Sequence, residues 1–283
     1  MTVIDAHHHL WDPRVRDYPW MAGPELDPVR HRYTLGDLRR ETDAAGVDHT
    51  VLVQTVSEVA ETEEFLDTAA ASDGLIAGVV GWVDLTAPDV ADAIARLRAR
   101  PGGERLVALR HQVEDEPDPD WLARPEVRRG LRAVATAGLV YDLLVRVPQL
   151  PAARVAVQEL PDARFVLDHA AKPAIAAGSL EPWAGELAAT ARLPNVVCKL
   201  SGLVTEARWD DWDADRIRPY ADHVLGVFGP DRVMFGSDWP VCRLAASYGQ
   251  VRELADALVA GLSPAEREAV FHRSAARAYR LAV

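Results

Sequence analysis

Three consecutive histidines, His7, His8 and His9, close the first hydrophobic run of the chain, and Asp5 lies two residues before them. Side chains alternate between the two faces of a strand, so His7 and His9 are expected to share one face while His8 points to the other. Two imidazoles on one face can chelate a metal ion or bracket a substrate. The spacing therefore predicts that His7 and His9 act together in one site.

Eight short hydrophobic runs alternate with longer segments of helical pattern, and several of the runs are apolar throughout, as in parallel sheets covered on both faces. The runs span residues 3–10, 50–56, 76–83, 106–111, 139–145, 164–169, 195–200 and 233–238. Helices are expected at residues 35–45, 61–71, 88–100, 125–137, 182–192, 219–228 and 264–281. The repeated strand–loop–helix unit predicts one α/β domain over residues 1–283, a (β/α)8 barrel of the TIM type, with an open doubly wound sheet as the alternative.

In such a barrel the active site lies at the carboxyl ends of the strands. His7 and His9 close the first run, His169 closes the sixth, and Asp238 closes the eighth. Buried ionisable groups are costly unless they are paired, hydrogen-bonded or bound to a metal. These four side chains are therefore expected to converge on one cavity. The irregular segment 11–33, rich in proline and aromatic residues, is expected to fold over the mouth of that cavity.

The ordered set of motifs resembles the amidohydrolase superfamily, and within it the sugar-lactonase branch that includes L-fuconolactonase and L-rhamnonolactonase. The resemblance extends over nearly the whole chain. It rests on six motifs: Ile4-Asp5-Ala6-His7-His8-His9-Leu10-Trp11-Asp12, Tyr18-Pro19-Trp20, Arg110-His111-Gln112, Asp168-His169-Ala170-Ala171-Lys172-Pro173, Cys198-Lys199-Leu200-Ser201-Gly202-Leu203 and Gly236-Ser237-Asp238-Trp239-Pro240. It implies a hydrolase of carboxylic esters that opens a sugar-derived lactone. A decarboxylase or amide hydrolase of the same superfamily, and a non-catalytic protein that binds lactones or sugar acids, remain as alternatives.

Lactone hydrolysis needs a deprotonated water, a polarised carbonyl and a proton for the leaving oxygen. Asp238 is the candidate general base, and His169 is expected to help protonate the leaving oxygen. The predicted ligands of a metal ion are His7, His9, His169 and Asp238. Binuclear members of the superfamily carry a carboxylated lysine at the end of the fourth strand, where this chain has no lysine. The sequence therefore supports at most one divalent ion, best zinc, and leaves open whether the reaction needs it.

Four further side chains are candidates for binding the substrate: Trp20, Arg110, His111 and Lys172. The planar guanidinium of Arg110 suits a carboxylate or vicinal hydroxyls, although a structural ion pair is the alternative. Lys172 has a structural alternative as the partner of Asp142 or Asp168. Aromatic faces such as that of Trp20 stack well on sugar rings, but they can also simply line a cavity mouth.

The composition limits the partners. The formal charge is −12, which argues against binding to nucleic acid or to acidic membranes. Two cysteines without a paired spacing favour reduced thiols, and the start of the chain lacks a signal-peptide pattern. We therefore expect a cytoplasmic protein whose partner is a small-molecule lactone; the sequence leaves a homo-oligomer open.

Overall fold

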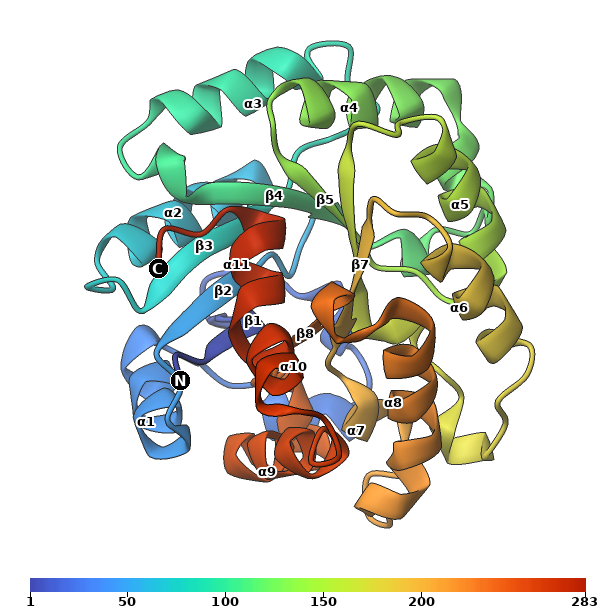
Figure 1. Cartoon of the computed structure of the whole chain (residues 1–283). Coiled ribbons are helices and arrows are strands. Elements are labelled where there is room, and N and C mark those ends of the chain that lie inside the picture. Colours follow the sequence, from blue (N-terminus) through green and yellow to red (C-terminus); the bar gives the residue numbers. More distant parts are fainter.

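Eight parallel strands follow one another around a barrel in sequence order, and helices join each strand to the next (Figure 1). The computed structural model describes all 283 residues. The strands are β1 (Ile4–His8), β2 (His49–Val53), β3 (Ile76–Gly81), β4 (Leu106–His111), β5 (Val140–Leu143), β6 (Arg164–Leu167), β7 (Val196–Leu200) and β8 (Val233–Phe235). The predicted single (β/α)8 barrel is therefore confirmed, and the alternative of an open sheet is wrong.

Eleven helices surround the strands or cover one end of the barrel. They are α1 (Leu35–Ala45), α2 (Val59–Ala70), α3 (Val90–Ala99), α4 (Pro125–Thr136), α5 (Leu150–Gln158), α6 (Trp183–Ala191), α7 (Leu203–Glu206), α8 (Ala214–Phe228), α9 (Tyr248–Leu258), α10 (Pro264–Glu268) and α11 (Ser274–Tyr279). No helix combines the length and the apolar composition that crossing a membrane requires.

The helix boundaries follow local capping where the sequence shows it. Helix α1 has the predicted bounds, because Thr34 and Asp37 form a capping box and Gly46 ends the helix in the left-handed conformation. The helix predicted at residues 219–228 instead begins at Ala214, after Asp213 caps its first turn. Helices α5 and α9 were not predicted, although the Ser247 capping box before α9 is visible in the sequence.

The carboxyl-terminal helix closes the amino-terminal end of the barrel. Ala275, Ala278 and Tyr279 of α11 pack in one cluster with inward-facing strand residues such as Ile4 and Val51. Figure 1 shows α11 lying across the strands at this end. A second and larger cluster lies between the strands and the outer helices. Because α11 fills one end, the carboxyl ends of the strands remain as the place for a pocket.

Strands β1 and β8 close the barrel through bonds made just beyond their ends. The backbone N–H of Asp238 donates to the carbonyl of His7 at 2.8 Å, and that of His9 donates to the carbonyl of Trp239 at 2.7 Å. Below them, the buried Asp5 carboxylate accepts from the backbone N–H and hydroxyl of Ser237 at 2.8 and 2.6 Å and from the Tyr248 hydroxyl at 2.9 Å. Asp5 thereby ties β1 to the β8 loop and to α9.

Removing one donor from Asp5 should destabilise the whole barrel. A hydrogen bond to a buried charged group contributes about 1.5–3 kcal/mol, so Tyr248→Phe should lower the free energy of unfolding by about that amount. Tyr220→Phe is the control, because its hydroxyl makes only a 3.3 Å contact with the Ser179 carbonyl and should cost less than about 1 kcal/mol. Urea denaturation followed by circular dichroism measures both; equal losses would show that the Asp5 contact has no special weight.

Candidate active site

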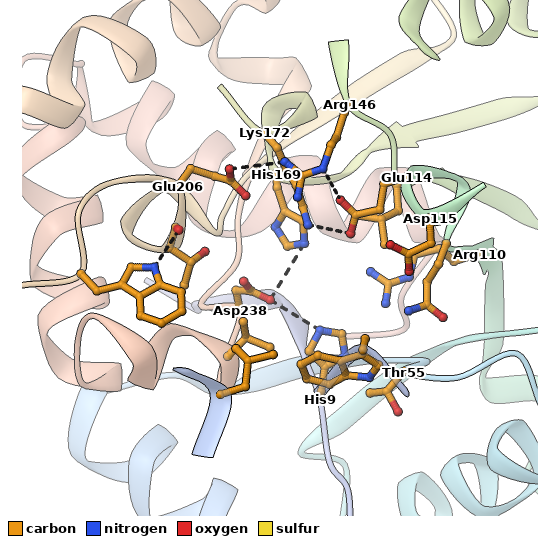
Figure 2. Close-up of a pocket in the computed structure, with 17 residues that line it drawn as sticks. His9, Thr55, Arg110, Glu114, Asp115, Arg146, His169, Lys172, Glu206 and Asp238 are labelled. Carbon is orange, nitrogen blue, oxygen red and sulfur yellow. Dashed lines mark hydrogen bonds and ion pairs between the residues drawn. The ribbon is translucent and has the colours of Figure 1, made fainter. Parts of the chain in front are cut away.

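A pocket of about 360 Å³ opens at the carboxyl ends of the strands. Figure 2 shows its lining side chains. It contains three of the four residues predicted to converge, His9, His169 and Asp238, and His7 lies directly beneath it. Trp20 and Leu26 of the segment 11–33 also line the pocket, so this segment borders the cavity that it was expected to cover.

The two faces of β1 carry its histidines as strand alternation requires. His7 Nε2 and His9 Nε2 lie 3.1 Å apart, whereas His8 Nε2 points elsewhere and lies 2.9 Å from Thr50 Oγ1. His9 Nδ1 lies 2.7 Å from the carbonyl oxygen of Val53. A carbonyl can only accept, so this contact places the proton on Nδ1 and leaves the Nε2 lone pair directed at the site.

Asp238 faces the imidazoles because the chain turns sharply after β8. Its φ is +56°, in the left-handed region that is costly for a residue other than glycine, so its neighbours must hold it there. Asp238 Oδ1 lies 3.5 Å from His9 Nε2, 3.8 Å from His7 Nε2 and 3.9 Å from His169 Nε2. One oxygen of Asp238 therefore lies within 3.9 Å of a nitrogen of each of the three imidazoles.

His169 is presented by an unusual turn after β6. Four consecutive residues without glycine, His169 to Lys172, have φ between 49° and 58°. The left-handed conformation costs roughly 1–2 kcal/mol per residue, and the surrounding structure compensates. The Trp183 indole N–H donates to the carbonyl of Ala170 at 2.6 Å, and the Lys172 N–H donates to that of His169 at 2.8 Å. This turn directs His169 and Lys172 into the pocket together.

Gly202 leaves the space that His169 occupies. Its φ is +67°, and a Cβ at this position would lie 2.7 Å from His169 Nδ1 and 3.2 Å from Asp238 Oδ2. His169 Nδ1 also lies 2.8 Å from the Ser201 hydroxyl. The Ser201 hydroxyl therefore holds the His169 ring in position, and the missing side chain at Gly202 leaves room for that ring.

A buried cluster of charges lies below the histidines. Lys199 Nζ donates to Asp142 Oδ2 at 2.7 Å, lies 2.9 Å from Asp168 Oδ1 and contacts His7 Nδ1 at 3.2 Å. Arg110 Nη1 donates to Asp168 Oδ2 at 3.0 Å and lies 3.4 Å from His7 Nε2. Lys199, whose role the sequence did not reveal, is therefore the partner of the two aspartates. The alternative partners of Lys172, Asp142 and Asp168, were wrong.

The electrostatics keep the imidazoles neutral and the carboxylate charged. Burial lowers the pKa of His169 to about 4, and burial also lowers the pKa of His7 and of His9. For Asp238, burial raises the pKa, but His169 and His9 outweigh burial and hold the pKa below its ordinary value. Near neutral pH the site therefore offers neutral imidazoles and one anionic oxygen, a set suited to binding a cation or activating water.

The donor set fits a divalent metal ion. Ligand atoms about 2.0–2.2 Å from a tetrahedral zinc lie roughly 3.3–3.6 Å from one another. The separations among His7 Nε2, His9 Nε2 and Asp238 Oδ1 are 3.1, 3.5 and 3.8 Å. His7, Asp168 and His169 form a second group with comparably close donor atoms. Asp168 is already engaged by Lys199 and Arg110, so the group with Asp238 is the better site.

The candidate substrate-binding residues are placed differently from one another. Trp20, Arg110 and Lys172 line the pocket. The Arg110 guanidinium is also engaged by Asp168 and by the side chain of Gln54, as its structural alternative required. His111 is not among the lining residues: its Nδ1 accepts from the Trp82 indole, its Nε2 lies 2.8 Å from Glu116, and its ring stacks on Trp121. Contact between His111 and substrate stays a prediction.

Several pocket residues had no signal strong enough to be singled out from the sequence. They are Glu114, Arg146, Glu206 and Trp209. Glu114 belongs to an acidic segment typical of a solvated loop. Arg146 and Trp209 lie in segments without a motif, and Glu206 is the last residue of the short helix α7. Only their positions after strands β4, β5 and β7 indicated that they could border the pocket.

A family model described as Amidohydrolase matches residues 4–281. The chain belongs to the amidohydrolase family. This confirms the resemblance seen in the motifs. The chain is 40% identical over 289 residues to an L-fucono-1,5-lactonase of Burkholderia multivorans, covering 98% of this chain and 96% of that one. It is 24% identical over 225 residues to an L-rhamnono-gamma-lactonase of Scheffersomyces stipitis, covering 68% and 65%.

A solved amidohydrolase structure from Burkholderia multivorans with bound zinc superposes with a TM-score of 0.93. Its sequence is 39% identical, and the superposition covers 99% of this chain and 100% of that one. Decarboxylases of 5-carboxyvanillate also share the fold, at 15% identity. A likeness at that level speaks only for the barrel.

Zinc content separates the three neighbouring histidines. His7→Asn and His9→Asn should each lose at least about 10-fold in zinc affinity, because each removes a candidate ligand. His8→Asn is the matched control on the opposite face and should retain zinc at the native stoichiometry. Equilibrium dialysis with elemental analysis measures all three. An equal loss in the three variants would contradict the assignment of His7 and His9 to one face.

Proposed function

We propose that this protein hydrolyses a neutral sugar-derived lactone, with L-fucono-1,5-lactone as the first substrate to test. The observation that carries the proposal is the Asp238 carboxylate in the pocket, within 3.9 Å of three imidazole nitrogens. Membership of a hydrolase family and the 40% identity to an L-fucono-1,5-lactonase support a hydrolase acting on a cyclic ester. The pocket is large enough for one sugar ring.

Asp238 is the general base in this proposal. Its pKa lies below the ordinary value because His169 and His9 outweigh the effect of burial, so the carboxylate is ionised near neutral pH. It takes a proton from a water molecule whose oxygen then bonds to the lactone carbonyl carbon. The bond from this carbon to the ring oxygen breaks next, and the proton held by Asp238 goes to the ring oxygen. The product is an open hydroxy acid.

His169 is placed to help this second proton transfer. Its Nε2 faces Asp238 at 3.9 Å, and Ser201 and Gly202 hold the ring in position. A neutral imidazole can relay a proton between a carboxyl group and a leaving oxygen. A divalent ion held by His7, His9 and Asp238 would polarise the carbonyl and lower the pKa of the attacking water.

A panel of lactones tests the function directly. Purified protein is mixed with five- and six-membered aldonolactones, and acid release is followed with a pH indicator. We expect hydrolysis of at least one of them. Carbon dioxide released from a carboxylated substrate without lactone opening would favour a decarboxylase instead. Lactone binding by calorimetry without any turnover would favour a binding protein.

Asp238→Asn should lower kcat by about 10²-fold or more, because the amide keeps the shape and cannot accept the proton of water. Asp73→Asn is the matched control. It lies on the surface with a side chain that is 88% exposed, and it has a left-handed φ of +53° that asparagine tolerates. Steady-state kinetics on the best lactone measure both variants, and native turnover by Asp238→Asn would remove this residue from the role of base.

A further inference from the structure

Four charged side chains form a continuous chain along one wall of the pocket. Lys172 Nζ donates to Glu114 Oε1 at 2.6 Å, Arg146 Nε lies 3.2 Å from Glu114 Oε2, and Arg146 Nη1 lies 3.8 Å from Glu206 Oε2. Figure 2 shows these four side chains together in the upper half of the view, above Asp238 and His9. We call Lys172, Glu114, Arg146 and Glu206 the charged wall.

The charged wall comes from different strands than most of the reacting groups. Glu114, Arg146, Lys172 and Glu206 follow β4, β5, β6 and β7 in turn, whereas His9 and Asp238 follow β1 and β8. Only the β6 loop contributes to both groups, through His169 and Lys172. The pocket is therefore divided into a side that can carry the chemistry and a side whose charged groups contact neither Asp238 nor the β1 histidines directly.

The charged wall keeps hydrogen-bonding capacity that the protein does not use. Glu114 Oε2 is buried without a hydrogen-bond partner, although it pairs electrostatically with Arg146. The Arg146 side chain makes no hydrogen bond within the protein, and the Glu206 carboxylate has only its long ion pair. Lys172 uses one of its three N–H donors. Unused donors and acceptors therefore alternate along the wall. A hydroxyl group can donate one hydrogen bond and accept others, so hydroxyl groups suit such a surface.

The charge balance selects against an anionic ligand. The pocket is lined by three basic residues, Arg110, Arg146 and Lys172, and by four acidic residues, Glu114, Asp115, Glu206 and Asp238. Arg110 is already neutralised by the buried Asp168. Each cation of the wall already has an acidic partner, Lys172 with Glu114 and Arg146 with Glu114 and Glu206. The carboxylate of a carboxylated lactone would therefore add a further negative charge beside these two glutamates.

We propose that the charged wall is the specificity-determining subsite of this enzyme, in which Glu114, Arg146, Lys172 and Glu206 bind the ring hydroxyls of a neutral polyhydroxylated lactone. This inference rests on the proposed lactone hydrolysis. Buried groups built to meet a hydroxyl reject a substrate that lacks it, because they are then left unpaired. Removing a wall residue and removing the hydroxyl that it binds should therefore lower kcat/KM by less together than the sum of the two separate effects predicts.

A cycle of enzyme and substrate variants tests this overlap. Glu114→Gln and Glu206→Gln are each measured with the preferred aldonolactone and with a series of derivatives that lack one ring hydroxyl at a time. Each variant should lower kcat/KM for the full lactone by about 10- to 100-fold, mainly through KM. For the derivative without the matching hydroxyl, the same variant should cause less than about a 3-fold further loss.

The matched control is Glu159→Gln, which removes a carboxylate from an ion pair with Arg128 outside the pocket and should leave all lactones unaffected. Melting temperatures establish that the variants fold; if Glu114→Gln does not fold, Glu206→Gln decides, because its side chain is more exposed. The native enzyme should also disfavour a carboxylated lactone of equal ring size by at least about 10-fold.

A loss by the same factor for every lactone, or no loss at all, would overturn the assignment of the wall to hydroxyl binding while leaving lactone hydrolysis intact. A preference for the carboxylated lactone would overturn it as well. A native protein that hydrolyses no lactone of the panel would instead overturn the proposed function, and the assignment of the wall with it.

Discussion

The closure between β1 and β8 is the constraint on which the site depends. Asp238 and the β1 histidines are separated by almost the whole chain, and they meet because the backbone N–H of Asp238 binds the carbonyl of His7. The buried Asp5 carboxylate holds the same junction through Ser237 and Tyr248. The bonds that complete the barrel are thus the bonds that bring the Asp238 carboxylate to the imidazoles. A substitution that weakens the β1–β8 junction should therefore affect both the stability of the barrel and the position of Asp238.

Buried charge is the second condition that the fold must satisfy. Lys199 lies fully buried between Asp142 and Asp168 and reaches His7, and Arg110 completes the pairing of Asp168. Burial alone would raise the pKa of Asp168, but the nearby Lys199, His7 and Arg110 lower it well below its ordinary value. An ion cluster of this kind costs desolvation energy and repays it only when its geometry is complete. Its place beneath the pocket gives His7 a rigid support.

The pocket lies above this buried ion cluster, and one of its sides is the charged wall of Lys172, Glu114, Arg146 and Glu206. Asp238 and the histidines have their positions fixed by backbone bonds and a left-handed turn. Glu114, Arg146 and Glu206 lie instead in the segments that follow β4, β5 and β7 at the mouth of the barrel. The turn that presents His169 also sets the position of Lys172.

The sequence by itself determined the barrel and the convergence of His7, His9, His169 and Asp238, because strand alternation and the position of active sites at carboxyl ends of strands are local rules applied eight times. It also determined that His8 turns away. Only the tertiary structure decided that Lys199, and not Lys172, pairs with Asp142 and Asp168, that His111 is held by Trp82 and Glu116, and that Glu114 faces the pocket. The physical reason is that a long charged side chain can reach partners on several different segments. Which partner it pairs with depends on how the connecting segments fold, and residue spacing along the chain does not encode this.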